Sequence, residues 1–129
     1  MNTKSLRSII LVATLLLCSP ALLTAADAPG DAAAISAKLF AAIENTDYAA
    51  FVADGDAVFQ QKLKPEQFAA VAAQLAPMLK AGHAVTYLGE LQQKGFRVTL
   101  WKLSFKQGGD DLLATLSLKD GKVGGFWIR

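Results

Sequence analysis

The chain has 129 residues, 13 of them basic and 11 acidic, and Lys4 and Arg7 are the only charged residues before position 27. From residue 27 onward, 11 basic residues balance 11 acidic ones, and no basic block is present. This distribution excludes nucleic-acid binding driven by phosphate charge and steering toward an anionic surface. We therefore expect no nucleic-acid partner.

The first 26 residues have the layout of a secretory signal peptide. Two cations precede an apolar run from Ile9 to about Leu23, which small residues close. We predict cleavage after Ala26, export to the periplasm or the medium, and no membrane attachment afterwards. A membrane anchor would need about 20 uninterrupted apolar residues, and Pro20 interrupts this run. Lipid attachment at Cys18 is another alternative, which the bulky leucines before that cysteine disfavour.

Removal of the signal leaves residues 27–129 as one domain without a cysteine. This domain has no disulfide and no thiol nucleophile, so its stability depends on its core. All 11 aromatic residues lie in this part of the chain, which makes a single packed domain feasible.

Three helices are predicted in the first half of this domain. Apolar residues recur at helical spacing over residues 31–44. Cap-type residues at 45–47 start a second helix, and Pro65 opens a third that ends before Gly82. The short segment around Val58, between the second and third helices, fits an edge strand or an irregular turn.

After Gly82 the apolar period changes from about 3.6 residues to 2. The turn sequences QQKG, QGGD and KDGK separate four strand-like runs. Helices followed by a strand meander predict an α+β fold, in which N-terminal helices pack on a curved, four-stranded antiparallel sheet.

The run FRVTLWKLSF, residues 96–105, changes the phase of its alternation halfway. Its first three apolar residues are at even positions and its last three at odd positions: Phe96, Val98 and Leu100, then Trp101, Leu103 and Phe105. We predict that the second half faces the core and the first half faces a partner or a partial cover. A β-bulge near Leu100, which would turn all six residues inward, is the alternative.

Counting outward from the turns predicts the pairs on the core face. A two-residue turn at 108–109 gives Phe105–Leu112, Leu103–Ala114 and Trp101–Leu116. A turn at 120–121 gives Leu118–Val123 and Ala114–Trp127. A three-residue loop ending in Gly95 gives Tyr87–Trp101, Val85–Leu103 and His83–Phe105, and a slip of one residue would reverse this last assignment.

The opposite face of the sheet carries polar residues in its middle and apolar residues around them: Phe96, Val98, Leu100, Leu113, Phe126 and Ile128. A face with this many apolar residues is typical of a contact surface. We expect it to mediate a homodimer.

The element order, with ENTDYAAFVA early, KPEQF and MLKAGH around the long helix, and LSLKDGKVGGFWIR at the end, resembles the nuclear transport factor two-like (cystatin-like cone) superfamily. The resemblance covers about residues 33–129 and is greatest to small exported domains of unknown function. It implies a curved sheet that wraps the helices and leaves a pocket at the open end of a cone. Several such proteins dimerise through the outer sheet face. Some are enzymes, such as ketosteroid isomerase and scytalone dehydratase, but many are binding or accessory domains, and no catalytic motif matches here residue by residue.

Four residues are candidates for lining such a pocket: Tyr87, Trp101, Trp127 and His83. The aromatic side chains would form a wall for an apolar or ring-shaped ligand, or serve as ordinary core. His83, the only histidine, is either a general base or a half-exposed residue at a helix-to-strand junction. A metal at His83 would need carboxylates, and the nearest, Glu90, lies on the other strand face.

The predicted function is that of an exported, non-catalytic binding or accessory domain with a small apolar pocket for an apolar ligand. No catalytic residue, metal or cofactor is assigned. Asp54 and Asp56 resemble paired carboxylates, but a solvated turn explains them without any chemistry. One alternative is a structural homodimer. Another is a small lyase or isomerase in which His83 or Tyr87 transfers a proton.

Overall fold

The structure, a computed structural model, describes residues 27–129. The predicted signal peptide and Cys18 lie outside the described residues. The predicted cleavage site follows Ala26, so Asp27, the first described residue, would begin the cleaved chain. Within this range no helix combines the length and the hydropathy needed to cross a membrane.

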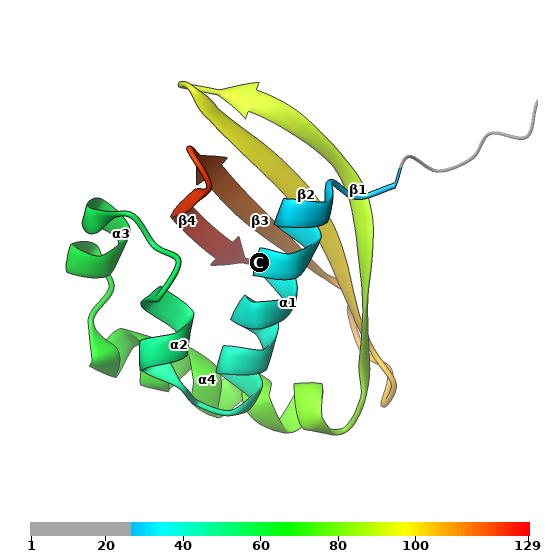
Figure 1. The fold of residues 1–129 in the computed structure, drawn as a ribbon. Coiled ribbons are helices and arrows are strands. Elements are labelled where there is room, and N and C mark those ends of the chain that lie inside the picture. The colour runs from blue at the N-terminus through cyan, green and yellow to red at the C-terminus, as the bar shows by residue number, and fades with distance from the viewer. Residues whose placement is uncertain (1–26) are drawn as a thin grey trace, which may run out of the picture.

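Four helices precede four strands: α1 (Gly30–Glu44), α2 (Tyr48–Val52), α3 (Ala57–Lys62), α4 (Pro65–Lys80), β1 (His83–Gln93), β2 (Phe96–Phe105), β3 (Leu112–Lys119) and β4 (Lys122–Ile128). The strands form one antiparallel sheet in the order β1-β2-β3-β4. Figure 1 shows the helices gathered on one side of this sheet. The predicted α+β fold with a four-stranded meander is confirmed.

Aspartate side chains fix the starts of the two short helices. Asp47 accepts a hydrogen bond from the backbone N–H of Ala50 at 3.0 Å, and Asp56 accepts one from Phe59 at 2.7 Å. The segment around Val58 is therefore the capped helix α3, and its prediction as an edge strand or an irregular turn is wrong. A helix of 6 residues is too short for helical periodicity to appear in its sequence.

Strands β1 and β2 pair in the predicted register close to the helices. Tyr87 lies opposite Trp101, Val85 opposite Leu103 and His83 opposite Phe105. The connecting turn has two residues, Lys94 and Gly95, with φ of 51° and 81°, whereas the prediction was a three-residue loop. A bulge at Leu88, between Tyr87 and Gly89, compensates for this difference.

Strand β2 pairs with β3 without a bulge. The apolar residues of its second half therefore face the core and those of its first half face outward, as predicted. Leu103 pairs with Leu112 and Trp101 with Ala114. The predicted register was two residues away, because the connection spans residues 106–111 and is longer than a two-residue turn. A shift of two residues keeps every side chain on its face, and Trp101 and Leu103 remain in the core.

Strand β4 corrects three of the predicted face assignments. The turn at Asp120 and Gly121 and the pair Leu118–Val123 are as predicted, but a bulge at Gly124 shifts the rest of the strand by one residue, so Thr115 pairs with Trp127. Trp127 therefore points away from the helices and is 56% exposed. Phe126 and Ile128, predicted on the outer face, turn inward and pack against the core, because one inserted residue exchanges the two faces of a strand.

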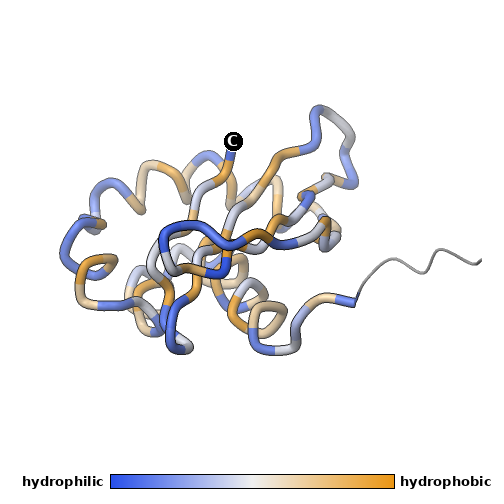
Figure 2. The backbone as a smooth tube through the Cα atoms, turned by 90° about the horizontal axis from the view of Figure 1, so that it is seen from above, coloured by the Kyte–Doolittle hydropathy of each residue, from blue (hydrophilic) through white to orange (hydrophobic). Residues whose placement is uncertain are grey.

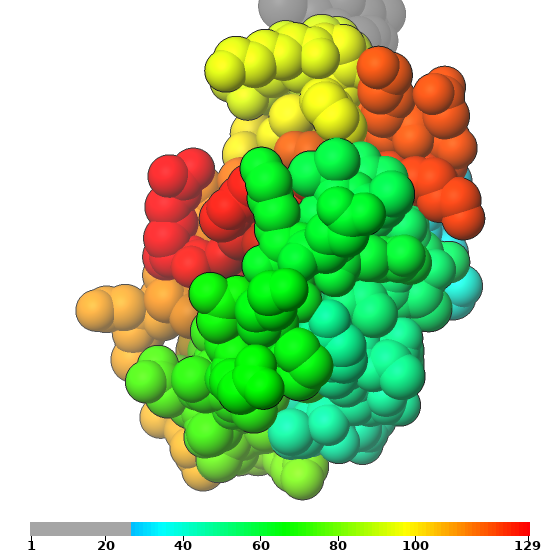
Figure 3. All heavy atoms as spheres, turned by 90° about the vertical axis from the view of Figure 1, so that its left-hand side faces the viewer, coloured from blue at the N-terminus to red at the C-terminus, as the bar shows by residue number. Residues whose placement is uncertain are grey.

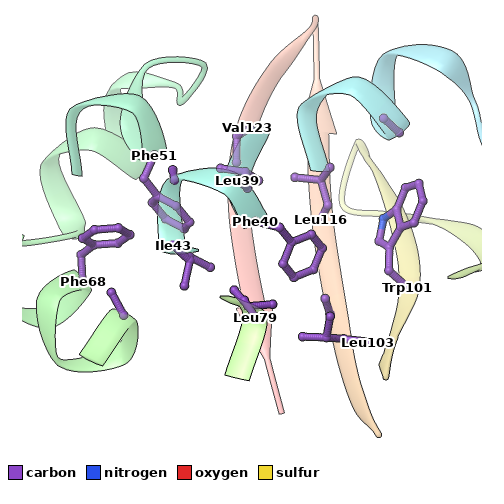
Figure 4. Packing of buried hydrophobic residues seen from close by; sticks show 14 of the residues in the cluster. Leu39, Phe40, Ile43, Phe51, Phe68, Leu79, Trp101, Leu103, Leu116 and Val123 are labelled. Atoms are coloured by element: carbon purple, nitrogen blue, oxygen red, sulfur yellow. The ribbon is translucent and has the colours of Figure 1, made fainter. Parts of the chain in front are cut away.

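The core lies between the helices and the inner face of the sheet. Figure 4 shows Trp101 at one end of this core and Phe51 and Phe68 at the other, with Leu39 and Phe40 of α1 between them. The buried indole nitrogen of Trp101 donates to the hydroxyl of Thr99 at 2.9 Å. Seen from above in Figure 2, hydrophilic residues are concentrated in the peripheral turns. Burial of this apolar layer is the main stabilising contribution to the fold.

Candidate functional site

Of the four predicted pocket residues, the structure brings only Tyr87 and Trp101 together. Trp101 is 4% exposed, and its ring packs against that of Tyr87 with 5.2 Å between the ring centres. These two side chains fill the core and line none of the four cavities that adjoin Trp127. Trp127 lies on the other face of the sheet.

His83 lies at the junction between α4 and β1. Its Nδ1 donates to the carbonyl oxygen of Leu79 at 3.0 Å, and its ring centre lies 6.4 Å from that of Phe40. The histidine thus bonds to the last turn of α4, on the half-exposed border of the core. This position agrees with a structural role.

The aspartates around Gly55 have structural partners. Asp54 forms an ion pair with Lys38 at 3.3 Å, and Asp56 caps α3. The backbone of the same turn bonds to Val123 on both sides, through the carbonyl of Asp54 and the N–H of Asp56, each at 2.8 Å. The turn therefore attaches the helices to β4. In residues 27–129, no three histidine, cysteine or acidic side chains gather in a metal-binding arrangement.

An apolar cleft of about 280 Å³ opens between the helices and the inner side of β4. We call it the helix cleft, and its lining residues are Ile43, Phe51, Phe59, Leu63, Gln67, Phe68, Val71, Phe126, Trp127 and Ile128. Four phenylalanines line its interior, and the ring centre of Phe51 lies 4.9 Å from Phe68, 5.8 Å from Phe126 and 5.9 Å from Phe59. Rings at these distances form a rigid apolar wall.

The mouth of the helix cleft is open to solvent. Val71 of α4 and Trp127 of β4 are 48% and 56% exposed, although both are apolar. Figure 3 shows the C-terminal residues beside the helices on this face of the molecule. The amide of Gln67 and the indole N–H of Trp127 are the only polar side-chain groups among the lining residues. The cleft can therefore receive an apolar group and offer it one hydrogen-bonding amide, but it contains no acid or base.

The sequence carries no signal that the four phenylalanines line a cleft. Phe51 and Phe68 fit the apolar stripes of their helices, and helical spacing is the same for a core residue and for the wall of a cleft. Phe126 was assigned to the opposite face by parity. Only the bulge at Gly124, together with helix α3, brings these side chains together.

Neither a protein-family model nor a curated protein matches this sequence. Among solved structures, the chain is similar to an uncharacterized cystatin-fold protein from Novosphingobium aromaticivorans, with 12% identity, a TM-score of 0.42, and coverage of 74% of this chain and 95% of that one. It is also similar to an NTF2-like protein of unknown function from Cytophaga hutchinsonii, with 7% identity, a TM-score of 0.40, and coverage of 74% and 85%. A third similar structure is TerC co-crystallized with polyporic acid, with 12% identity, a TM-score of 0.44, and coverage of 77% and 90%. The likeness to these structures concerns the fold alone.

Proposed function

We propose that this protein is an exported, non-catalytic binding domain that holds a small apolar ligand in the helix cleft. The supporting observation is the combination of a preformed aromatic wall with apolar side chains left exposed at the mouth. Ligand sites are typically concave, mostly apolar, and supplied with few polar groups. Gln67 would orient the ligand through the N–H groups of its amide, because the amide oxygen accepts from the backbone N–H of Lys64 at 3.1 Å.

The absence of ionisable side chains among the cleft residues supports binding without catalysis. Proton transfer needs an acid or a base within hydrogen-bonding reach of the reacting atom. His83 and Tyr87, the two residues considered for that role, do not line the helix cleft. A bound molecule would therefore meet phenylalanine rings, the indole of Trp127, aliphatic groups and one amide.

Toluene, a small apolar probe, tests the helix cleft directly. Saturable shifts are expected in the NMR signals of the Leu63 and Ile43 methyl groups, which line the cleft. The variant Val71→Arg places a charge at the mouth, and because burying a charge beside an apolar ligand is unfavourable, toluene binding should weaken about tenfold or more.

Met78→Arg is the matched control, because Met78 lies on the same helix, is 37% exposed, and is not a residue of the helix cleft. It should leave the affinity for toluene unchanged. Equal losses in the two variants, or methyl shifts that never saturate, would refute the assignment of this cleft.

Export is tested separately by expressing residues 1–129 in a bacterial host and measuring the mass of the product. The expected product is periplasmic or secreted and begins at Asp27, because the residues before it have the charge and apolar pattern of a signal peptide. A precursor of unchanged mass, or a product with lipid on Cys18, would contradict this part of the proposal.

A further inference from the structure

The outer face of the sheet is hollowed along β2, β3 and β4. Two cavities of about 540 and 500 Å³ lie there, and they share the lining residues Gln93, Val98, Ser117 and Trp127. Together they form one open channel across the strands, which we call the outer groove. It lies on the face opposite the helices, since Val98 and Ser117 have the reverse parity of Trp101 and Leu116.

Two hydroxyl groups in the floor of the outer groove have no hydrogen-bond partner among residues 27–129. Thr115 and Ser117 are only 6% and 9% exposed. No side-chain oxygen in this range is both wholly buried and unbonded, so the two hydroxyls are open to the groove that they line. Covering a hydroxyl without bonding to it is unfavourable. A ligand seated on this floor therefore has to supply polar atoms.

Aromatic rings flank the same floor, and two glycines make room for them. A Cβ atom at Gly124 would collide with the ring of Phe96, and one at Gly125 would collide with the indole of Trp127. Both rings line the groove. The exposed indole offers a flat face to a second ring, and aromatic pairs favour such offset contacts.

The charged side chains that line the outer groove are all basic. Lys94 lies in one of the two cavities and Arg129 in the other. Neither belongs to an ion pair among the described residues. The outward positions of β2, β3 and β4 hold no acidic residue and carry three further lysines, Lys102, Lys119 and Lys122, of which Lys102 is paired with Asp111. This arrangement favours an anion, and a guanidinium group binds a carboxylate through two parallel hydrogen bonds.

We propose that the outer groove is a binding site for a small aromatic carboxylate. The ring of the ligand lies against Trp127, while its carboxylate binds the guanidinium of Arg129 and accepts hydrogen bonds from Thr115 and Ser117. These residues line one cavity. The site shares Trp127 and Ile128 with the helix cleft but has its polar residues, Thr115, Ser117 and Arg129, outside it, and it does not depend on the function proposed for that cleft.

A second copy of the chain is a poorer occupant of this face, although the sequence predicts a homodimer there. A twofold axis brings the same surface of two copies together. The lysine and arginine side chains of one copy would then approach those of the other, and like charges across an interface are unfavourable. The second copy would also offer no carboxylate to accept hydrogen bonds from the hydroxyls of Thr115 and Ser117.

The test is an NMR titration of the labelled protein with 2-naphthoate, with the uncharged 2-naphthalenemethanol and with acetate. The indole N–H signal of Trp127 and the methyl signals of Val98, which lines the outer groove and not the helix cleft, should shift and saturate with 2-naphthoate. The indole signal of Trp101, bonded to Thr99 in the core, should stay in place. The naphthoate should bind about tenfold more tightly than the alcohol, because hydrogen bonds to a charged group contribute more than neutral ones. Acetate, which lacks the ring, should bind more weakly than naphthoate.

Variants locate the ligand within the groove. Arg129→Gln and Ser117→Ala should each weaken 2-naphthoate binding about fivefold or more. Lys122→Gln removes a charge from the same face, and because Lys122 lines neither cavity, the affinity should change less than about twofold.

Three results would overturn the proposal. The first is equal affinity for the naphthoate and the alcohol, or an unchanged affinity in Arg129→Gln. The second is a set of shifts at Leu63 and Phe68 with none at Val98, which lines the outer groove and not the helix cleft; this would locate the probe in the helix cleft and leave the proposed function standing. The third is a mass that doubles with protein concentration while the Trp127 signal shifts without any probe, which would identify the face as a dimer interface.

Discussion

Thr99 shows how one polar side chain can hold a large aromatic group in an apolar core. It is fully buried, accepts from the indole nitrogen of Trp101 at 2.9 Å, and lies 3.4 Å from the carbonyl oxygen of Leu116. Every side-chain nitrogen or oxygen that is wholly buried among the described residues has a hydrogen-bond partner. The indole therefore has a fixed place at its end of the core.

Thr99→Val keeps the shape of this side chain but removes the acceptor. The unpaired indole N–H should then lower the free energy of unfolding by about 1–3 kcal/mol, measured by denaturant titration. Thr86→Val, at an exposed position on β1, is the control and should change it by less than about 0.5 kcal/mol. In a Trp101→Phe background, Thr99→Val should lower the free energy of unfolding by less, because the indole N–H that bonds to Thr99 is no longer present. A cost that is independent of Trp101 would contradict this account.

At the scale of secondary-structure elements, an ion pair connects the start of α1 to the start of β2. Arg97 donates to the carboxylate of Asp31, which lies in the first turn of α1. The hydrogen bond from Arg97 lowers the pKa of Asp31 from its ordinary value of 3.8. The two groups are 66 residues apart in sequence, so the pair links the two layers of the fold.

The lowered pKa of Asp31 predicts how this link responds to acid. A carboxyl group with a lower pKa in the folded state contributes stability above its unfolded pKa, and that contribution is lost as the pH falls through the folded pKa. Arg97→Gln should return the pKa of Asp31 toward 3.8 and reduce the loss of stability below about pH 4. NMR titration of the Asp31 carboxyl and unfolding curves between about pH 2 and 6 measure both effects.

Lys38→Gln is the control for this titration, since Lys38 pairs with Asp54 and not with Asp31. Its Asp31 titration should match that of the unmodified protein. If Arg97→Gln leaves the Asp31 titration unchanged, the guanidinium is not the cause of the lowered pKa.

The elements also show what residue patterns can and cannot predict. The turn at Asp120 and Gly121 was predictable because this dipeptide readily adopts positive φ, and both residues do so here. The face of Trp127 was not predictable, because parity counting assumes a regular strand and cannot detect the extra residue at Gly124. The pair Gly124–Gly125 was the available signal, since glycine inside a strand often marks a bulge.

At the scale of the whole molecule, the sequence predicted the fold class and the compact layer of helices on one sheet face. The change of apolar period after Gly82 extends over the whole strand region. It therefore predicts the fold class correctly even where the register of a single strand pair is predicted wrongly. The helix cleft was not predictable in the same way. It needs α3, which was missed, and the inward turn of Phe126, which depends on a single bulge.

The two bulges are placed where an open sheet is most vulnerable. Leu88 lies on β1 and Gly124 on β4, and these are the two edge strands of the sheet. An unbroken edge strand presents a continuous row of backbone donors and acceptors to other chains, and a bulge interrupts that row and twists it away. The same irregularities that decide which aromatic residues face the helices thus also hinder edge-to-edge growth into fibrils.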